Sequence, residues 1–383
     1  MKNKLFRITT VPISLEKLLE DQLKFMNNYF EVTAIASDKK NLEKFGENES
    51  VNSFYLNLTR QITPVKDLIA VWKLSRYFRV TKPYIVHTHT PKAGIVGMLA
   101  AYIAKVPHRL HTVAGLPLME STGIKRKVLN YVEKLTYACA TKVYPNSKGL
   151  EEFILKENFT KSSKLKIIGN GSSNGIDTSY FNPNLYTVTS KEELKVKLGI
   201  SEFDKVFIFI GRIVSDKGIN ELISAFDNLL QKHTNIKLLL VGPLESDLDP
   251  LQEQTLKIIE TNQHIISLGF QKDVRPFLAI SDILTFPSYR EGFPNVVLQA
   301  SAMGLPSIVT NINGCNEIIT DNLNGIIIPK KNTDALAEAM SILIKNSILF
   351  NKLRVNARKL IQEKYERKVF WEALLQEYKS LDK

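Results

Sequence analysis

Short apolar runs alternate with segments of helical periodicity along the whole chain. In the first half, strands are predicted at 5–11, 30–37, 83–90, 109–115, 142–147 and 164–171, and helices at 14–29, 67–80, 93–104 and 121–140. In the second half, strands are predicted at 205–211, 236–242, 265–270, 283–288, 306–310 and 324–329. Helices are predicted there at 218–233, 250–260, from about 294, and over about 334–380. This alternation predicts an α/β protein whose parallel sheets are covered by helices on both faces.

The 383 residues exceed one ordinary core and suit two domains of about 150–200 residues each. A polar, proline-containing segment at 177–194 separates the two halves. We therefore expect a doubly wound, Rossmann-like domain at 1–184 and a second one at 185–365. Ligands of open α/β sheets bind outside the carboxyl ends of the strands, so two such domains would hold a ligand in a cleft between them.

The net charge of +12 lies entirely in the first half. Residues 1–184 contain 27 basic and 15 acidic side chains, whereas 185–383 contain 24 of each. A one-sided basic surface suits an anionic partner, such as nucleic acid, an acidic membrane face or a phosphorylated acceptor. The alternative is a lysine-rich surface that only confers solubility. We expect no nucleic-acid partner, because the chain has no recognisable nucleic-acid module and no interleaved aromatic and basic motifs.

Cysteine usage and hydropathy bear on the compartment. Cys139 and Cys315 form neither a disulfide framework nor a metal-binding pattern, which predicts a reducing compartment. The first residues carry charges and a proline where a secretory signal needs an apolar run. No segment approaches the ~18 uninterrupted apolar residues of a membrane-spanning helix. These features predict a cytoplasmic protein.

The segment "FIGRIVSDKG" at 209–218 is the first candidate for chemistry. A predicted strand ends at Gly211, which has no Cβ to obstruct a ligand near the backbone. Arg212 and Lys217 follow, just before a predicted helix. Two cations beside a helix N-terminus suit a phosphate group, although solvated surface charge is the alternative.

The segment "SYREGFPNVVLQASAMGLP" at 288–306 is the second candidate. Glu291 lies in the predicted turn, and Pro294 suits the first turn of the following helix. Backbone N–H groups of 292–296 lack intrahelical partners there, so they suit a diphosphate while Glu291 accepts hydrogen bonds from sugar hydroxyls. Gln299 is expected one turn inside the helix. The alternative is a capping glutamate and a neutral glutamine.

Taken together, the "GR" and "KG" pairs, "REGFPNVVLQASAMGLP", "NGCNEII" and "NLNG" resemble the retaining family 4 glycosyltransferases. In the first half, "TTVPISLEKLLEDQLKFM", "KPYIVHTHTPKAGIVGMLAA" and "IGNGSSNGID" are similar to the bacterial branch that builds capsule, O-antigen and exopolysaccharide. The resemblance covers essentially the whole chain. It implies the GT-B fold, with two Rossmann-like domains facing a central cleft and a C-terminal helix near 366–383 that packs back on the first domain.

The resemblance implies a role for individual residues. Arg212 and Lys217 would hold the diphosphate of a UDP-linked nucleotide-sugar donor, and Glu291 would bind the sugar hydroxyls. The other implied donor-binding residues are Gly211, Phe270, Gln271, Gly292, Phe293, Pro294, Asn295, Val296 and Gln299. The donor would supply a hexose or N-acetylhexosamine to a glycan carried on a polyprenyl diphosphate. A soluble acceptor is the alternative.

Two positions depart from the family pattern. Gln299 stands where the family usually has a ribose-binding glutamate, which predicts weaker nucleotide binding by about 1 kcal/mol. Ala114 stands where many relatives have a histidine, and His111 has no motif support as a substitute. We therefore expect a reaction in which the leaving phosphate oxygen takes the proton and the protein stabilises the leaving charge. Loss of catalysis, leaving a nucleotide-sugar-binding protein, is the alternative.

Further residues are expected to face the cleft. They are Ser14, His87, His89 and Gly115. A His-x-His pair can bind metal, but no acidic or cysteine ligand stands nearby, and GT-B relatives do not depend on a metal. We expect no metal and no cofactor. For the two histidines, contact with the acceptor and a buried, hydrogen-bonded role both stay open.

The segment 121–140 is predicted to be an amphipathic basic helix. Ile124, Val128 and Tyr131 recur at helical spacing among Lys125 and Lys127. Such a helix suits the surface of an anionic membrane, although packing within the first domain is the alternative. With the charge asymmetry, it predicts a peripheral protein on the cytoplasmic face of the inner membrane.

Overall fold

The computed structural model describes residues 2–59, 61, 63–245 and 249–382. The chain forms two compact units, one of Met1–Gly175 with Lys368–Lys383 and one of Ile176–Arg367. The division at 175/176 precedes the predicted boundary at 184/185. The reason is that Ile176 and Phe181 lie in the core of the second unit. Arg358 also fastens this segment, because its guanidinium donates to the carbonyl of Phe181 over 2.7 Å.

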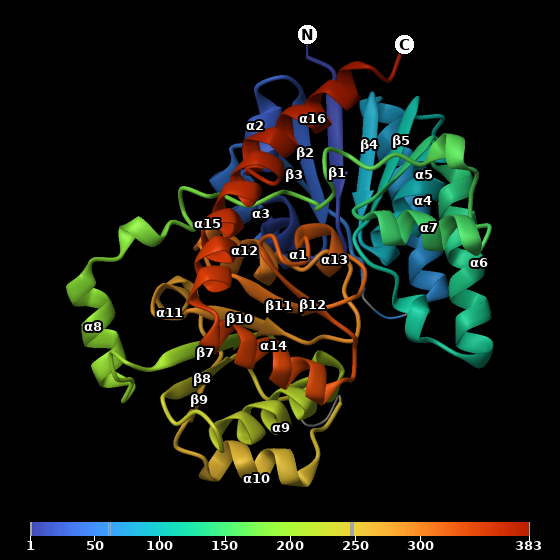
Figure 1. The fold of residues 1–383 in the computed structure, drawn as a ribbon. Coiled ribbons are helices and arrows are strands. Elements are labelled where there is room, and N and C mark those ends of the chain that lie inside the picture. Colours follow the sequence, from blue (N-terminus) through green and yellow to red (C-terminus); the bar gives the residue numbers. More distant parts are fainter. Residues whose placement is uncertain (1, 60, 62, 246–248, 383) are drawn as a thin grey trace. The chain divides into compact units, whose positions relative to one another are not determined.

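The first unit is built on a parallel sheet. Among the described residues this sheet has six strands in the order β3-β2-β1-β4-β5-β6 (Figure 1). The strands are β1 (Lys4–Ile8), β2 (Glu31–Ala36), β3 (Asn52–Tyr55), β4 (Ile85–His89), β5 (His108–Val113) and β6 (Lys142–Pro145). The strand order reverses between β1 and β4, which is the switch point where doubly wound sheets bind ligands.

Helices cover both faces of this sheet. One face is covered by α4 (Pro64–Thr81), α5 (Pro91–Ile103), α6 (Gly123–Cys139) and α7 (Lys148–Lys156). The other is covered by α1 (Pro12–Leu19), α2 (Gln22–Asn27), α3 (Lys39–Glu49) and α16 (Arg367–Lys379). The C-terminal helix α16 therefore packs on the first unit, where it buries Phe370, Trp371, Leu374 and Tyr378.

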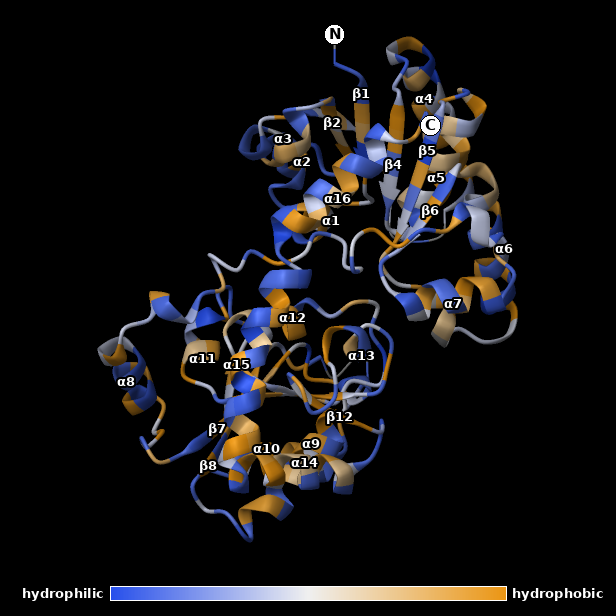
Figure 2. Ribbon diagram, turned by 45° about the horizontal axis from the view of Figure 1, so that its top comes forward, coloured by the Kyte–Doolittle hydropathy of each residue, from blue (hydrophilic) through white to orange (hydrophobic). Residues whose placement is uncertain are grey.

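The second unit repeats this construction. Its sheet, again counted over the described residues, has six parallel strands in the order β12-β11-β10-β7-β8-β9. They are β7 (Lys205–Ile210), β8 (Ile236–Val241), β9 (Ile265–Gly269), β10 (Ile283–Phe286), β11 (Ser307–Thr310) and β12 (Gly325–Ile328). The helices are α8 (Val188–Lys197), α9 (Ile219–Leu230), α10 (Glu253–Thr261), α11 (Arg275–Ala279), α12 (Asn295–Ala302), α13 (Cys315–Ile318), α14 (Thr333–Lys345) and α15 (Ser347–Lys364). The central strands are mostly hydrophobic, as expected for sheets buried on both faces (Figure 2).

The predicted helix at 14–29 is wrong in detail, because it consists of the two helices α1 and α2. Asp21 separates them in the left-handed region with φ 59°. The carboxylate of Glu49 accepts hydrogen bonds from the N–H of Asp21 over 2.7 Å and from the N–H of Lys24 over 3.0 Å. A side chain from another helix therefore caps the start of α2, which local periodicity does not reveal.

Other predicted elements also differ. The strand predicted at 164–171 is wrong: Leu165 makes only an isolated bridge to Val143, and the chain turns at Gly169 and Gly171. The helices predicted over about 334–380 are confirmed as α14, α15 and α16. In the part of the chain that the structure describes, no helix combines the length and apolar character needed to cross a membrane.

Candidate functional site

The two candidate motifs of the second unit meet at the middle of its sheet. Strands β7 and β10 are neighbours, with Phe207 paired to Ile283. The segment with Arg212 and Lys217 follows β7, and the segment with Glu291 follows β10. Because the sheet is parallel, both segments leave it at the same edge, which is where open α/β sheets bind ligands.

Lys217 and Glu291 form the centre of this site. The Nζ of Lys217 lies 2.5 Å from Oε1 of Glu291, and the two side chains are only 15% and 16% exposed. The hydroxyl of Ser288 donates to the same carboxylate oxygen over 3.0 Å. A mostly buried cation and carboxylate therefore stand side by side at the carboxyl edge of the sheet.

Gly218 explains the position of Lys217. It begins α9 with φ 72°, and a Cβ there would lie 2.2 Å from the carbonyl oxygen of Pro287. Only glycine fits this backbone conformation and this approach. The "KG" pair thus brings the turn Ser215–Lys217 against the end of β10.

Arg212 has a different partner. Its Nη1 lies 3.1 Å from Oε2 of Glu245, in the segment after β8, and its side chain is 41% exposed. The structure therefore pairs each of the two predicted phosphate-binding cations with its own carboxylate. Sequence analysis missed both pairings, since neither partner lies near its cation along the chain.

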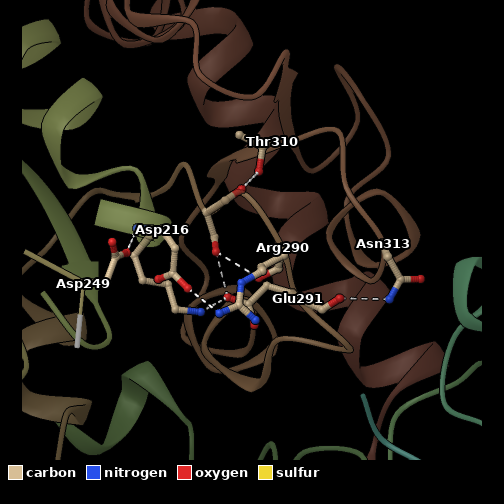
Figure 3. Close-up of polar contacts among 8 residues, drawn as sticks. Asp216, Asp249, Arg290, Glu291, Thr310 and Asn313 are labelled. Atoms are coloured by element: carbon tan, nitrogen blue, oxygen red, sulfur yellow. Dashed lines mark hydrogen bonds and ion pairs between the residues drawn. The ribbon is translucent and has the colours of Figure 1, made fainter. Parts of the chain in front are cut away.

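A second ion pair joins the two segments. The Nη2 of Arg290 lies 2.6 Å from Oδ2 of Asp216 (Figure 3). The N–H of Tyr289 donates to the carbonyl of Asp216 over 2.9 Å. The N–H of Asp216 in turn donates to Asp249 over 2.5 Å. These contacts fix the turn that carries Lys217 relative to the turn that carries Glu291. Apart from the charges of these residues, no sequence pattern predicts the contacts.

The "NG" pair, Asn313 and Gly314, packs against the turn at 291–294. The Nδ2 of Asn313 donates to the carbonyl of Glu291 over 3.0 Å (Figure 3). It also donates to the carbonyl of Gly292 over 2.7 Å. A Cβ on Gly314 would lie 2.5 Å from the carbonyl of Gly292. Asn313 and Gly314 thus position the predicted sugar-binding turn at 291–294.

Helix α12 begins at Asn295, directly after Pro294, so its first N–H groups have no intrahelical acceptor. Among the predicted phosphate-binding positions, Phe293 and Pro294 are buried and Val296 is half-buried. Gln299 lies one turn into the helix and is half-buried.

The predicted nucleobase positions follow β9. The ring of Phe270 is 74% exposed. The side chain of Gln271 points back toward β9, because its Nε2 donates to the carbonyl of Leu268 over 2.7 Å. An exposed aromatic face suits stacking on a planar base, whereas the amide of Gln271 already has a partner.

The candidates of the first unit divide into open and buried positions. Ser14 lies in the first turn of α1 and is half-buried, and Gly115 has no atom within 4 Å of the place where a Cβ would stand. His87 and His89 are buried, and burial together with the charge of Arg7 lowers the pKa of both rings well below 6.5. Both histidines are therefore neutral and hydrogen-bonded within the unit.

His111, the other histidine weighed as a base, is also inaccessible. Its Nδ1 lies 2.8 Å from the hydroxyl of Thr88, and burial lowers its pKa to about 4. Within the described residues, no group of three or more His, Cys, Asp or Glu side chains has the arrangement to hold a metal ion.

Two doubly wound parallel units, one with cations and a carboxylate at the edge of its sheet, are the architecture of a GT-B glycosyltransferase. Two protein-family models match the chain. The family described as "Glycosyl transferases group 1" matches residues 190–360, and the family described as "Glycosyl transferase 4-like domain" matches residues 28–171. A solved glycosyltransferase from Rickettsia africae ESF-5 superposes with a TM-score of 0.82, at 20% identity, covering 100% of this chain and 99% of that one. Anabaena HepE in complex with UDP gives 0.80 at 18% identity, covering 99% and 100%.

Comparison with relatives of known sequence shows the family to which the chain belongs. The Staphylococcus aureus capsular polysaccharide biosynthesis glycosyltransferase CapM is 34% identical over 98% of this chain and 96% of its own. An Escherichia coli UDP-Gal:alpha-D-GlcNAc-diphosphoundecaprenol alpha-1,3-galactosyltransferase is 29% identical over 88% and 85%. The chain belongs to the family 4 glycosyltransferases with the GT-B fold, in the bacterial surface-polysaccharide branch that its motifs resemble.

Proposed function

We propose that this glycosyltransferase moves a hexose or N-acetylhexosamine from a UDP-sugar to a glycan on a polyprenyl diphosphate, with retention at the anomeric carbon. The observation that carries the proposal is the meeting of Lys217 and Glu291 at the carboxyl edge of the sheet, beside the start of α12. One relative acts on a diphosphoundecaprenol-linked sugar with UDP-Gal, and HepE was solved with UDP.

The charges suit each part of such a donor. Lys217 and Arg212 supply positive charge for the diphosphate, and the first N–H groups of α12 supply hydrogen-bond donors. Glu291 accepts hydrogen bonds from sugar hydroxyls. When the donor enters, its phosphates compete with Glu291 and Glu245 for the two cations, so binding exchanges internal ion pairs for pairs with the ligand.

The reaction requires no base from the protein. The acceptor hydroxyl attacks the anomeric carbon on the face that UDP is leaving, the bond from that carbon to the phosphate oxygen breaks, and the hydroxyl proton passes to that oxygen. Lys217, Arg212 and the helix N-terminus stabilise the charge that develops on the leaving diphosphate. Ala114 and the buried His111 are consistent with this route, and no metal or cofactor enters it.

Transfer from UDP-sugars to a lipid extract tests the proposal. We expect a product whose anomeric configuration, read by NMR, matches that of the donor. Lys217→Met should lower kcat at least about 100-fold, because it removes a charge that acts mainly in the transition state. Lys257→Met, at an exposed position on α10, is the matched control. Donor binding without transfer would instead support a nucleotide-sugar-binding protein, and transfer to soluble sugars alone would contradict the lipid-linked acceptor.

We also propose peripheral contact with an anionic membrane through the first unit. On α4, Val65, Leu68, Ile69 and Trp72 follow helical spacing and are all exposed, with Trp72 59% exposed. On α6, Ile124, Val128 and Tyr131 repeat this arrangement. Lys66, Lys73, Arg76, Lys125, Lys127 and Lys134 flank the two stripes. Exposed apolar stripes with basic borders suit the interface of an acidic bilayer.

Flotation with vesicles tests this contact. The protein should float with vesicles containing anionic phospholipid at low salt, and binding should weaken as salt rises. Leu68→Ser with Trp72→Ser should reduce binding at least about tenfold, since burial of these side chains contributes several kcal/mol. Ile348→Ser, at an equally exposed apolar position on α15, is the control. Equal flotation of all three proteins would contradict the assignment of α4.

A further inference from the structure

The chain passes between the two units twice, and the first of these crossings lies at a glycine. The first segment of the first unit ends at Gly175, and the second unit begins at Ile176. Gly175 has φ 63°, in the left-handed region that glycine adopts about as readily as the right-handed one. The backbone on its two sides is fastened to different units.

The peptide before Gly175 is fastened to the first unit. The N–H of Gly175 donates to the hydroxyl oxygen of Ser172 over 3.1 Å, and Ser172 is buried in this unit. The preceding residue, Asn174, is also buried. Its Oδ1 accepts hydrogen bonds from Nε2 of Gln22 over 2.9 Å and from Nε1 of Trp371 over 2.6 Å. The peptide that joins 174 to 175 therefore keeps its place relative to the first unit.

The peptide after Gly175 is fastened to the second unit. The N–H of Ile176 donates to the carbonyl of Tyr365 over 2.8 Å, and the carbonyl of Ile176 accepts from the N–H of Arg367 over 2.9 Å. The side chain of Ile176 is 4% exposed and packs in the core of the second unit. The angles φ and ψ of Gly175 are therefore the two torsions between a peptide fixed to one unit and a peptide fixed to the other.

The second crossing runs beside the first, at the start of α16. Arg367 is bonded to Ile176 in the second unit, and Trp371 is bonded to Asn174 in the first. The two crossings are therefore joined to each other on both sides of the boundary. Residues 368 and 369, which lie between these contacts, are exposed. The N–H groups of a helix's first turn have no intrahelical acceptor, so this turn deforms more easily than the rest of α16.

We propose that Gly175 is a hinge residue, at which changes of φ and ψ turn the second unit relative to the first. Hinges are a few residues that absorb a change of backbone torsion, and here the fastened peptides confine that change to Gly175 and the first turn of α16. A Cβ would disfavour the left-handed arrangement about 5–30-fold. Lys217 and Glu291 lie within the second unit, so rotation at Gly175 leaves the geometry of the donor residues unchanged.

Distances between spin labels on the full chain test the hinge. Labels at Lys44→Cys on α3 and Lys257→Cys on α10 report on the two units, and both native cysteines are buried. Their distance distribution, measured by pulsed electron paramagnetic resonance in frozen solution, should be broader than that of labels at Lys257→Cys and Lys352→Cys, which both lie in the second unit. Gly175→Ala should shift the populations about 5–30-fold away from the left-handed arrangement. Gly175→Asn should shift them less, because asparagine tolerates this region better.

Gly199→Ala is the matched control. Gly199 has φ 65° and, among the described residues, no atom beyond its chain neighbours within 4 Å of the place where a Cβ would stand. It lies inside the second unit, so this variant carries the same backbone strain but should leave the distribution unchanged. Equal distributions in Gly175→Ala and the unaltered protein would overturn the proposal. If Gly175→Ala does not fold, the unaltered protein decides, because a distribution as narrow as that of the pair within one unit would overturn it too.

A kinetic measurement connects the hinge with glycosyl transfer and, unlike the distances, rests on the proposed function. Gly175→Ala should lower kcat at least about fivefold, because the left-handed arrangement becomes rarer. The dissociation constant of UDP should stay within about twofold, and Gly199→Ala should change neither quantity. A parallel loss of UDP affinity in Gly175→Ala would show that the substitution damages the second unit and would contradict a hinge. Failure of the unaltered protein to transfer sugar would refute the proposed function and leave the spin-label result standing.

Discussion

The ammonium group of Lys217 and the carboxylate of Glu291 approach within 2.5 Å although the residues are 74 positions apart. Each comes from a turn at the end of a central strand, and each is mostly shielded from water. Without a ligand, the site is therefore electrically balanced. In the proposed donor complex, the diphosphate draws Lys217 away from Glu291, and the sugar hydroxyls then donate hydrogen bonds to the carboxylate of Glu291.

This exchange predicts opposite effects of Glu291→Gln on two ligands. Turnover of the UDP-sugar should fall about 10–100-fold, because charge-assisted hydrogen bonds to the sugar are lost. Binding of UDP alone should be unchanged or tighter, since a negative charge that faces the phosphates is gone. Calorimetry with UDP and initial rates with the donor measure both. A parallel loss in UDP affinity would contradict the role of Glu291 in sugar binding.

Arg212 is held by Glu245 in the same manner, but at a more exposed position. Glu245→Gln should free the guanidinium and tighten UDP binding by up to about fivefold, which is the scale of a partly exposed ion pair. Glu253→Gln, an exposed substitution in the same unit, is the control. Weaker UDP binding in Glu245→Gln would show that this carboxylate positions Arg212 rather than competing for it.

Gln299→Glu tests the ribose position. A carboxylate accepts stronger hydrogen bonds from ribose hydroxyls than an amide does, so the dissociation constant of UDP should fall by about fivefold. Gln263→Glu, which is exposed, measures the effect of an added charge alone. An unchanged constant in Gln299→Glu would remove Gln299 from the nucleotide site.

Gly314→Ala tests whether Gly314 supports the predicted sugar-binding turn at 291–294. Its φ is 75°, and the new Cβ would lie 2.5 Å from the carbonyl of Gly292. Gly304→Ala has a similar φ of 82° but meets no atom within 4 Å, so it measures backbone strain alone. Each should lose about 1 kcal/mol or more of stability from strain. Only Gly314→Ala should also lower the turnover of donor, measured below the melting temperature of both variants.

Glu133 makes the stability of the first unit depend on pH. It is buried in α6, and burial raises its pKa from 4.5 to about 7. Between these values the folded state keeps a proton that the unfolded chain has lost, so stability falls as pH rises from about 4.5 to 7. Glu133→Gln should remove this loss and raise the melting temperature at pH 8, with little change at pH 4.5. The exposed Glu152→Gln should do neither. Identical pH profiles for all three proteins would contradict the assignment.

The local pattern of apolar and polar residues was sufficient to predict the strands at the centres of both sheets and the turns that carry Lys217 and Glu291. It failed where a distant side chain decides the outcome. Glu49 divides the predicted helix at 14–29, and Ile176 and Phe181 assign a polar segment to the second unit. The ion pairs of Arg212 and Arg290 could not be predicted from the sequence either, because partners on separate loops become neighbours only when the sheet has formed.

The position of α16 governs the order in which the chain can fold during synthesis. The first unit needs Phe370, Trp371 and Tyr378 to complete one face of its core, yet these residues are translated after the whole second unit. The second unit is contiguous, so all of its residues emerge before that face is covered. While the second unit is being translated, the face of the first unit that α16 later covers therefore stays open to solvent.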